Sequence, residues 1–236
     1  MRLVFDNNYF LLTHSITFFI NDIMQKGKAM TFTPIDINSW DRKEYFEHYY
    51  KNIPCTYSMT VTLDITNLKA QNRHLYSTLL FYVTKLINQH KEFRICYNRE
   101  GTLGFYDEMI PSYTVFNKET ETFTSIWTTM HKDYGEFYAE YKKDVEIYGK
   151  NKGLFGKPDT PENVFNVSMI PWISFEGFNL NLQKGYDYLL PIFTFGKYYY
   201  KNSQCLLPLS VQVHHAVCDG FHLSRFVNEL QKMLDR

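Results

Sequence analysis

The sequence predicts an α/β fold, a two-layer sandwich in which a mixed β-sheet carries helices on one side. Residues 57–64 alternate apolar and polar side chains, which is typical of a strand with one solvated face. Residues 76–87 and 134–148 instead repeat apolar side chains at three- and four-residue steps, as amphipathic helices do. At 236 residues the chain is long enough to bury one sizeable core. We therefore expect a single domain, which the motifs described below place at residues 30–236.

The remaining elements follow from local patterns. Asp41 and Glu44 have the spacing of a capping box, so a short helix is expected to begin at Asp41. Residues 149–161 are rich in glycine and proline and predict a loop. The other predicted strands are residues 93–97, 104–106, 113–116, 122–127, 178–182, 189–198 and 205–213, with a further β-like run around Ser168.

Residues 1–29 differ in character from the rest of the chain. Their apolar residues at 9–12 and 16–20 are interrupted by polar ones, and no small-residue cleavage pattern follows. The apolar runs are also too short for a membrane span. We expect an N-terminal extension without a catalytic role, ahead of a domain that starts at about Met30.

Charge and cysteine content exclude several classes of partner. The chain has 25 Lys and Arg against 25 Asp and Glu, so no excess of positive charge is present to bind nucleic acid or an anionic membrane. The four cysteines have no C-x-x-C spacing and predict neither a zinc site nor a disulfide framework. We expect no metal site, no nucleic-acid partner, no membrane partner, and a reducing cytoplasm as the setting. The 18% aromatic content fits a pocket for a flat apolar ligand, a subunit interface or a large core.

Residues able to move protons are concentrated near the C-terminus. The strand at 205–213 is followed by His214 and His215, then by Asp219-Gly220, which predicts a turn. Apolar residues at three- and four-residue steps after the turn predict an amphipathic helix. Adjacent histidines at a strand end point to opposite faces, so one can face a cleft while the other packs behind it. A neutral, oriented imidazole is the side chain best suited to remove a proton from a hydroxyl group near neutral pH.

The segment Gln-Val-His-His-Ala-Val-Cys-Asp-Gly-Phe-His, residues 212–222, resembles the active-site signature of the chloramphenicol acetyltransferases. In that family the second histidine is the general base, which implies this role for His215. The shorter pattern HH-x-x-x-DG is less specific, because the acyltransferase cores of 2-oxo acid dehydrogenase complexes and the condensation domains of peptide synthetases share it.

Two earlier segments add to the resemblance. Trp40-x-Arg42 resembles the pattern whose arginine pairs with the motif aspartate, which implies an ion pair between Arg42 and Asp219. Asn-Val-Ser-x-x-Pro-Trp, residues 166–172, resembles the segment whose serine hydroxyl donates to the oxyanion of the tetrahedral intermediate. The resemblance therefore implies that Ser168 stabilises this charge, a contribution that is often worth about 3 kcal/mol of barrier.

Substrate-binding residues are implied by the same family. Ile-Phe-Thr-x-Gly-Lys-Tyr, residues 192–198, resembles a run in which the threonine, Thr194 here, helps order water at the acceptor. Lys197 and Tyr198 then lie near coenzyme A, as a lysine beside a phosphate and an aromatic ring beside adenine would. The positions that match the lining of the antibiotic pocket are Tyr49, Ile53, Cys55, Tyr57, Phe123, Phe178, Leu180 and Ile192.

The family also implies an architecture and a reaction. The fold is expected to be chloramphenicol acetyltransferase-like, and the protein a homotrimer with active sites at subunit interfaces. The implied reaction transfers the acetyl group of acetyl-CoA to the 3-hydroxyl of chloramphenicol in a ternary complex. Acetyl-CoA is then a co-substrate, and no bound cofactor is expected.

Three alternatives remain open at this point. The chain could be the enzyme core of a dihydrolipoyl acyltransferase, although no lipoyl domain or Ala/Pro linker is present in this sequence. It could be a binding protein that sequesters an apolar drug without catalysis. Cys218 could also act as a thiol nucleophile, although a buried side chain behind the motif explains it at least as well.

Overall fold

The computed structural model describes residues 30–181 and 187–236. Phe32–Arg236 form one compact unit. The predicted N-terminal extension, residues 1–29, lies outside the described residues, so the division at Met30 stays a prediction.

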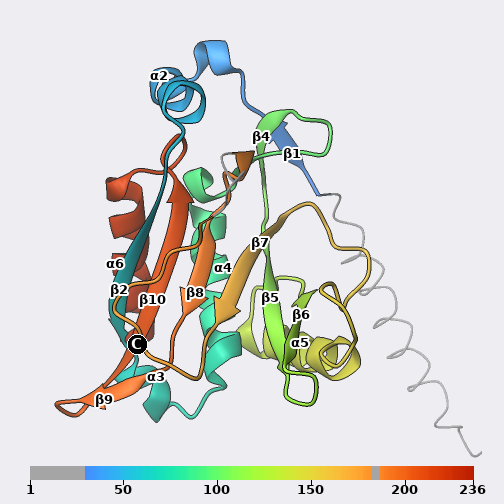
Figure 1. Cartoon of the computed structure of the whole chain (residues 1–236), viewed down its shortest axis with the longest axis vertical. Coiled ribbons are helices and arrows are strands. Elements are labelled where there is room, and N and C mark those ends of the chain that lie inside the picture. The colour runs from blue at the N-terminus through green and yellow to red at the C-terminus, as the bar shows by residue number, and fades with distance from the viewer. Residues whose placement is uncertain (1–29, 182–186) are drawn as a thin grey trace, which may run out of the picture. The chain divides into compact units, whose positions relative to one another are not determined.

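The main sheet is mixed, and its strands lie in the order β2-β10-β8-β7-β5-β6, with β9 paired to β10 (Figure 1). Strand β7 runs parallel to β8 and β5, and the other neighbours run antiparallel. The strands are β2 (Thr56–Asp64), β5 (Ile110–Asn117), β6 (Thr122–Trp127), β7 (Val164–Met169), β8 (Ile192–Phe195), β9 (Tyr199–Lys201) and β10 (Gln204–His214). Strand β10 pairs with β8 as far as Gln212 and with β2 as far as His214, so the end that carries His214 is held in the sheet by β2.

Three 15-residue helices of the described chain cover one face of this sheet (Figure 1). They are α4 (Leu75–Gln89), α5 (Tyr134–Tyr148) and α6 (Gly220–Leu234). Four of the apolar residues that predicted α6 are buried, namely Leu223, Phe226, Leu230 and Leu234. The ring of Phe226 lies 4.9 Å from that of Phe93 and 5.3 Å from that of Phe193 on β8. The predicted arrangement of helices on one side of a mixed sheet is confirmed.

The opposite face of the sheet carries a row of hydroxyl groups, one from each of six neighbouring strands. In strand order this hydroxyl row is Thr60, Ser210, Thr194, Ser168, Thr114 and Ser125. Residues opposite one another on neighbouring strands share a face. Because side chains alternate along a strand, the residues next to the row, such as Phe193 and Val211, face the helices instead.

A second, smaller sheet was not predicted as a separate layer. It contains β1 (Phe32–Pro34), β4 (Leu103–Tyr106) and β3 (Ile95–Tyr97), in that order and antiparallel. The remaining short elements are a 3₁₀ turn at Ile37–Ser39, α2 (Lys43–Glu47), a π-helical turn at His48–Asn52, α3 (Thr66–Ala70) and a 3₁₀ turn at Lys91–Phe93.

The strand predicted at residues 178–182 is wrong for residues 178–181, which pair with no strand of the described chain, and Leu182 lies outside it. The backbone of this segment instead bonds to two hydroxyl groups of the hydroxyl row. The N–H of Phe178 donates to Thr60 Oγ1 (3.3 Å), and its carbonyl accepts from Ser210 Oγ (2.6 Å). Side-chain hydroxyls therefore satisfy backbone groups that a neighbouring strand would otherwise bond.

The capping box predicted at Asp41 and Glu44 is also wrong. Helix α2 begins at Lys43, and its N-cap residue is Arg42, which makes no capping bond with its side chain. The guanidinium of Arg42 is directed instead to the loop that follows β10. A long-range contact therefore overrides the local capping signal.

Candidate active site

The loop after β10 is a tight turn that ends in a helix cap. The N–H groups of Val217 and Cys218 both donate to the carbonyl of His214 (3.1 and 3.0 Å). Asp219 then caps α6, because its carboxylate accepts from the N–H of Phe221 at 3.1 Å. Gly220 is the first residue of α6, so the Asp219 cap and the turn together fix how His215 leaves the sheet.

Arg42 holds this loop from a distant part of the chain. Its Nη1 donates to Asp219 Oδ2 (3.0 Å), its Nε to the carbonyl of Ala216 (3.0 Å), and its Nη2 to that of His215 (3.2 Å). Burial alone would raise the pKa of Asp219, but the hydrogen bond from Arg42 and the nearby positive charges hold this pKa below its usual value. The predicted ion pair is thus present, and the same guanidinium bonds the carbonyls of the base and of the residue that follows it.

The imidazole of His215 is held between two tyrosine rings. Tyr49 stacks on it, with 4.0 Å between ring centroids and 7° between the planes. Tyr57 meets it edge-on at 5.4 Å, and the N–H of His215 donates to the carbonyl of Cys55 at 2.9 Å. Nδ1 of His215 is buried and has no hydrogen-bond partner within residues 30–181 and 187–236, which leaves Nε2 as the nitrogen able to meet a ligand.

Cys218 lies behind the base and is almost fully buried, with 1% of its surface exposed. Burial raises the pKa of its thiol, and the carboxylates of Glu92 and Asp219 raise it further. A thiol in this environment stays protonated near neutral pH, so Cys218 is not an activated nucleophile.

A second group of predicted residues surrounds Ser168. Its Oγ lies 3.4 Å from Oγ1 of Thr114, and Thr194 is its partner on β8. Two pockets share Ser168 and Thr114. One, of about 250 Å³, is lined by Phe123, Leu154, Phe155 and Ile192 among others. The other, of about 520 Å³, is lined among others by Tyr76, Phe116, Met169 and Trp172.

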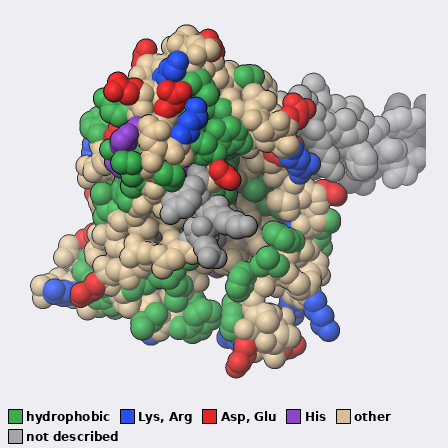
Figure 2. All heavy atoms as spheres, turned by 45° about the horizontal axis from the view of Figure 1, so that its top comes forward, with side chains coloured by type: hydrophobic (Ala, Val, Ile, Leu, Met, Phe, Trp, Pro, Cys, Tyr) green, Lys and Arg blue, Asp and Glu red, His purple; other side chains and the backbone are tan. Residues whose placement is uncertain are grey.

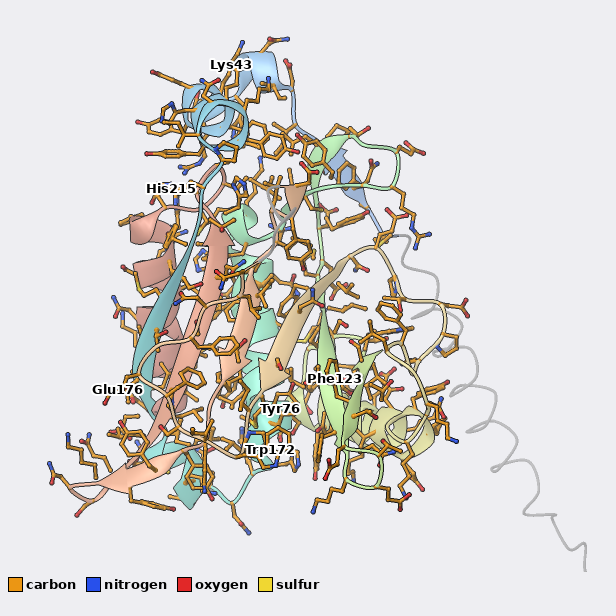
Figure 3. The ribbon with its side chains drawn as sticks, in the orientation of Figure 1. Lys43, Tyr76, Phe123, Trp172, Glu176 and His215 are labelled. Carbon is orange, nitrogen blue, oxygen red and sulfur yellow. The ribbon has the colours of Figure 1, made fainter. Side chains whose placement is uncertain are left out.

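The two groups lie at different levels of the sheet. Ser168 on β7 lies opposite Thr194 on β8, which in turn lies opposite Ser210 on β10. His215, by contrast, follows directly after the end of β10. Ser210 and His214 are four residues apart on β10, and β7 is two strands away from β10. At about 3.4 Å per residue and about 4.8 Å per strand, Ser168 therefore lies about 14 Å from His214 in the direction of the strands and about 10 Å from it in the direction across them. Figure 3 shows His215 at one end of the sheet and Tyr76, Phe123 and Trp172 near the other.

The other predicted binding residues are distributed between these groups. Ile53 and Leu180 are exposed, and Phe178 packs its ring 5.5 Å from that of Phe175. The N–H of Lys197 donates to the carbonyl of Ile173, next to the second pocket (2.9 Å). Tyr198 carries the ammonium of Lys69 over its ring, at 4.6 Å from the centroid.

Several pocket residues were not predicted. Trp172 is the last residue of the Asn-Val-Ser-x-x-Pro-Trp motif, but no role was predicted for it. Phe155, Thr114 and Tyr76 lie outside every motif. Phe155 and Trp172 are unusually exposed for aromatic residues, at 71% and 58%. Only the folded chain reveals that exposure, because composition and periodicity say nothing about which aromatic rings stay uncovered.

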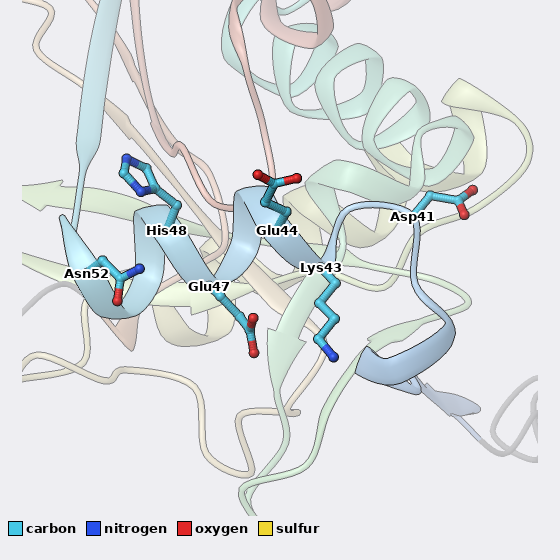
Figure 4. A pocket seen from close by; sticks show the side chains of 6 residues that line it. All are labelled: Asp41, Lys43, Glu44, Glu47, His48 and Asn52. Atoms are coloured by element: carbon cyan, nitrogen blue, oxygen red, sulfur yellow. The ribbon is translucent and has the colours of Figure 1, made fainter.

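A charged hollow of about 540 Å³ lies elsewhere, on α2 and the π-helical turn (Figure 4). It is lined by Asp41, Lys43, Glu44, Glu47, His48 and Asn52. Figure 2 shows acidic, basic and histidine side chains gathered on this part of the surface. Glu47 pairs with Lys51 at 3.4 Å, and no predicted site residue lines the hollow, so it is separate from the candidate active site.

Neither a metal cluster nor a membrane-spanning helix was found in the described part of the chain. No group of three or more His, Cys, Asp and Glu side chains there is arranged to hold a metal ion. No helix there is both long enough and apolar enough to cross a bilayer. All four cysteines are free thiols.

Comparisons with known proteins agree with the motifs. The sequence profile described as chloramphenicol acetyltransferase matches residues 30–231. A chloramphenicol acetyltransferase of Clostridium perfringens is 59% identical over 206 residues, which cover 87% of this chain and 100% of the relative. A chloramphenicol acetyltransferase of Campylobacter coli is 61% identical over 207 residues, 88% of this chain and 100% of the relative.

Solved structures confirm the predicted fold. A chloramphenicol acetyltransferase structure superposes with a TM-score of 0.75 at 22% identity, covering 86% of this chain and 100% of that one. A truncated catalytic core of the 2-oxoacid dehydrogenase multienzyme complex from Thermoplasma acidophilum gives 0.61 at 15% identity, over 86% and 98% of the two chains. Both likenesses, at 22% and 15% identity, are of fold alone. Because the profile and the close relatives span most of the chain, this protein belongs to the chloramphenicol acetyltransferase family.

Proposed function

We propose that this protein transfers the acetyl group of acetyl-CoA to the 3-hydroxyl of chloramphenicol, with His215 as the general base, and so inactivates the antibiotic. The observation that carries the proposal is the constrained imidazole of His215, stacked on Tyr49 and followed by a loop that Arg42 and Asp219 hold. A general base must be oriented toward the proton that it removes. A protein that only sequesters a drug has no need for this constraint.

In the proposed reaction Nε2 of His215 removes the proton from the 3-hydroxyl. The resulting alkoxide attacks the thioester carbonyl of acetyl-CoA, and Ser168 donates a hydrogen bond to the oxyanion that forms. Collapse of the tetrahedral intermediate breaks the carbon–sulfur bond, and the proton on His215 neutralises the departing thiolate of coenzyme A. Both substrates bind together, so the step becomes effectively unimolecular.

The two pockets that meet at Ser168 suit the two substrates. Ile192, which the family resemblance assigns to the antibiotic, lines only the smaller pocket, and Phe155 extends the aromatic wall there. Phe123, assigned in the same way, lines both pockets. The larger pocket is then left for the pantetheine arm of acetyl-CoA. Lys197, the residue expected near coenzyme A, supports this assignment, because its N–H donates to the carbonyl of Ile173, the neighbour of the pocket residue Trp172. The acyl group would then reach Ser168 from one side and the acceptor from the other.

We further propose that the active site forms between copies of the chain, in a homotrimer. The base and the oxyanion donor must both lie within about 3 Å of the same reacting centre. Within one chain Ser168 lies about 14 Å from His214 in the direction of the strands and about 10 Å from it across them. The proposal therefore pairs His215 of one subunit with Ser168 of its neighbour, which is the arrangement that the family resemblance implies. The four free thiols support a reducing cytoplasm as the setting.

The test is coenzyme A release, followed with a thiol reagent, when the full chain is mixed with acetyl-CoA and chloramphenicol. We expect release by the wild type and a loss of several orders of magnitude in His215→Ala. An amphenicol with fluorine in place of the 3-hydroxyl should give no release, because it offers no proton to remove. Release only with dihydrolipoamide would favour a dihydrolipoyl acyltransferase, and binding without release would favour a sequestering protein.

A further inference from the structure

Thr114 is the neighbour of Ser168 in the hydroxyl row, and it lines both pockets that meet there. The two hydroxyl oxygens are 3.4 Å apart, which is a long contact beside the usual O–H···O distance of about 2.5–3.0 Å, and either residue can be the donor. On its other side Thr114 faces Ser125, whose hydroxyl is already bonded to Ser112 at 2.9 Å. Within the described chain, Thr114 is the side chain whose hydrogen bond to the Ser168 hydroxyl the structure records.

The direction of this bond matters for the proposed reaction. A serine hydroxyl has a single proton, so Ser168 can donate either to Thr114 or to an oxyanion, but not to both. When Thr114 donates and Ser168 accepts, the Ser168 proton is not used between the two residues and is free to point into the pockets.

Tyr76 lines the larger pocket together with Thr114 and Ser168, and its own proton is already used. Its phenol donates to the carbonyl of Val167 at 3.2 Å, and a phenol has a single proton to donate. Tyr76 therefore does not orient the two hydroxyls by donating to them, and the proton of Thr114 is the one that can be directed to Ser168.

We propose that Thr114 is a positioning residue for the reaction: its hydroxyl donates to Ser168 Oγ and thereby turns the Ser168 proton toward the developing oxyanion. This inference rests on the proposed function. Donation from Thr114 also polarises the Ser168 hydroxyl, because hydrogen bonds in a chain strengthen one another. The effect belongs to the transition state, in which the oxyanion carries its charge, and not to substrate binding.

The experiment combines Thr114→Val, which removes the hydroxyl at nearly constant shape, with Ser168→Ala in a double-mutant cycle. Thr114→Val should lower kcat about 5- to 10-fold, the loss expected for one hydrogen bond, with each KM within about 2-fold of the wild type. Thr114→Ser keeps the hydroxyl and should retain most of kcat. In the Ser168→Ala background, Thr114→Val should change kcat by less than about 2-fold, because the proton that it orients is gone.

Two controls separate positioning from loss of structure. Thr84→Val deletes a buried threonine hydroxyl on α4, bonded to the carbonyl of Leu80 at 2.7 Å, and should leave kcat unchanged. Thermal unfolding of each variant shows whether it is folded, and Thr114→Ala takes the place of Thr114→Val if the latter is not.

The outcomes are distinct. Wild-type kcat in Thr114→Val, or the same fold-loss with and without Ser168, would overturn the inference while leaving the proposed function in place. No coenzyme A release by the wild type with chloramphenicol would overturn the proposed function, and this inference with it.

Discussion

The ring of Tyr49 lies parallel to the imidazole of His215, with 4.0 Å between their centroids and 7° between their planes. Tyr49 comes from the π-helical turn at His48–Asn52, which continues α2. Arg42, at the N-cap of the same helix, bonds the carbonyl of His215. One short helical segment therefore fixes both the backbone and the ring plane of the proposed base.

Removing the Tyr49 ring should lower activity by freeing the imidazole. A stacked aromatic pair is worth about 0.5–1.5 kcal/mol beyond its buried area. We expect Tyr49→Ala to lower kcat about 5- to 10-fold, and Tyr49→Phe, which keeps the stack, to retain most of it. The measurement is kcat for coenzyme A release at saturating acetyl-CoA and chloramphenicol. Equal kcat values for Tyr49→Ala and the wild type would show that the stack does not orient the base.

The contrast between Tyr49 and Arg42 shows how far the sequence alone could go. Arg42 and Asp219 are 177 residues apart, and their pairing was predicted from the family resemblance, in which each lies in a motif of its own. Tyr49 was predicted only as a residue of the antibiotic pocket. Its stack on His215 depends on the π-helical turn, which no periodicity in the sequence announces.

The separation of Ser168 from His215 could not be predicted either. The sequence gives each residue a role, but strand order and register decide their distance, and both arise from long-range pairing. The long, periodic helices were predicted nearly to their ends, since their apolar faces are encoded locally. The strand expected at residues 178–181 failed because side-chain hydroxyls bond that backbone.

Asp219→Asn should destabilise the protein in a pH-dependent way. The asparagine still caps α6 but no longer pairs with Arg42. About a third of the Asp219 side chain is exposed, so we expect a loss of about 1–2 kcal/mol in the free energy of unfolding at pH 7.

The pH dependence follows from the direction of the shift. Burial raises the pKa of Asp219, but the interactions with Arg42 and His222 together outweigh it and hold this pKa below that of the unfolded chain. Its contribution to stability is therefore complete above about pH 4, the unfolded value, and is lost as the pH falls through the lower folded value. Urea unfolding at a fixed protein concentration should show a constant difference between wild type and Asp219→Asn from pH 7 to pH 5, and a shrinking one below pH 4. A difference that grows as the pH falls would contradict the assignment.

Tyr57→Phe should leave stability unchanged or raise it. The Tyr57 hydroxyl is buried and makes no hydrogen bond of ordinary geometry among the residues that the structure describes. Burial raises the pKa of Tyr57, and the neighbouring Cys218 thiol is only a weak hydrogen-bonding group. Deleting an unsatisfied hydroxyl removes a desolvation penalty, so we expect a gain of about 0–1 kcal/mol in the free energy of unfolding. Tyr113→Phe is the matched control, because that hydroxyl bonds Thr128 Oγ1 at 2.8 Å and its deletion should cost about 1 kcal/mol. Equal losses in both variants would mean that the Tyr57 hydroxyl is satisfied in solution.

The buried ion pair between Asp144 and Lys157 should support the antibiotic pocket through the loop after α5. Lys157 Nζ lies 2.7 Å from Asp144 Oδ1 and donates to the carbonyl of Trp127 on β6 at 3.0 Å. The same loop is hydrogen-bonded to the backbone of β6, because the N–H of Ser125 donates to the carbonyl of Leu154 at 2.7 Å. Phe155 follows directly and enters the smaller pocket, so the ion pair anchors the wall that it forms.

Lys157→Met leaves the Asp144 carboxylate buried without its counter-charge, since only 6% of that side chain is exposed. We expect a loss of about 3–5 kcal/mol in the free energy of unfolding and a raised KM for chloramphenicol. Adding Asp144→Leu removes the uncompensated charge and should recover part of the stability. Lys51→Met, at the exposed pair with Glu47, should cost less than about 0.5 kcal/mol. The measurement is urea unfolding of the wild type and the three variants. A double variant no more stable than Lys157→Met would show that packing, and not the unpaired carboxylate, accounts for the loss.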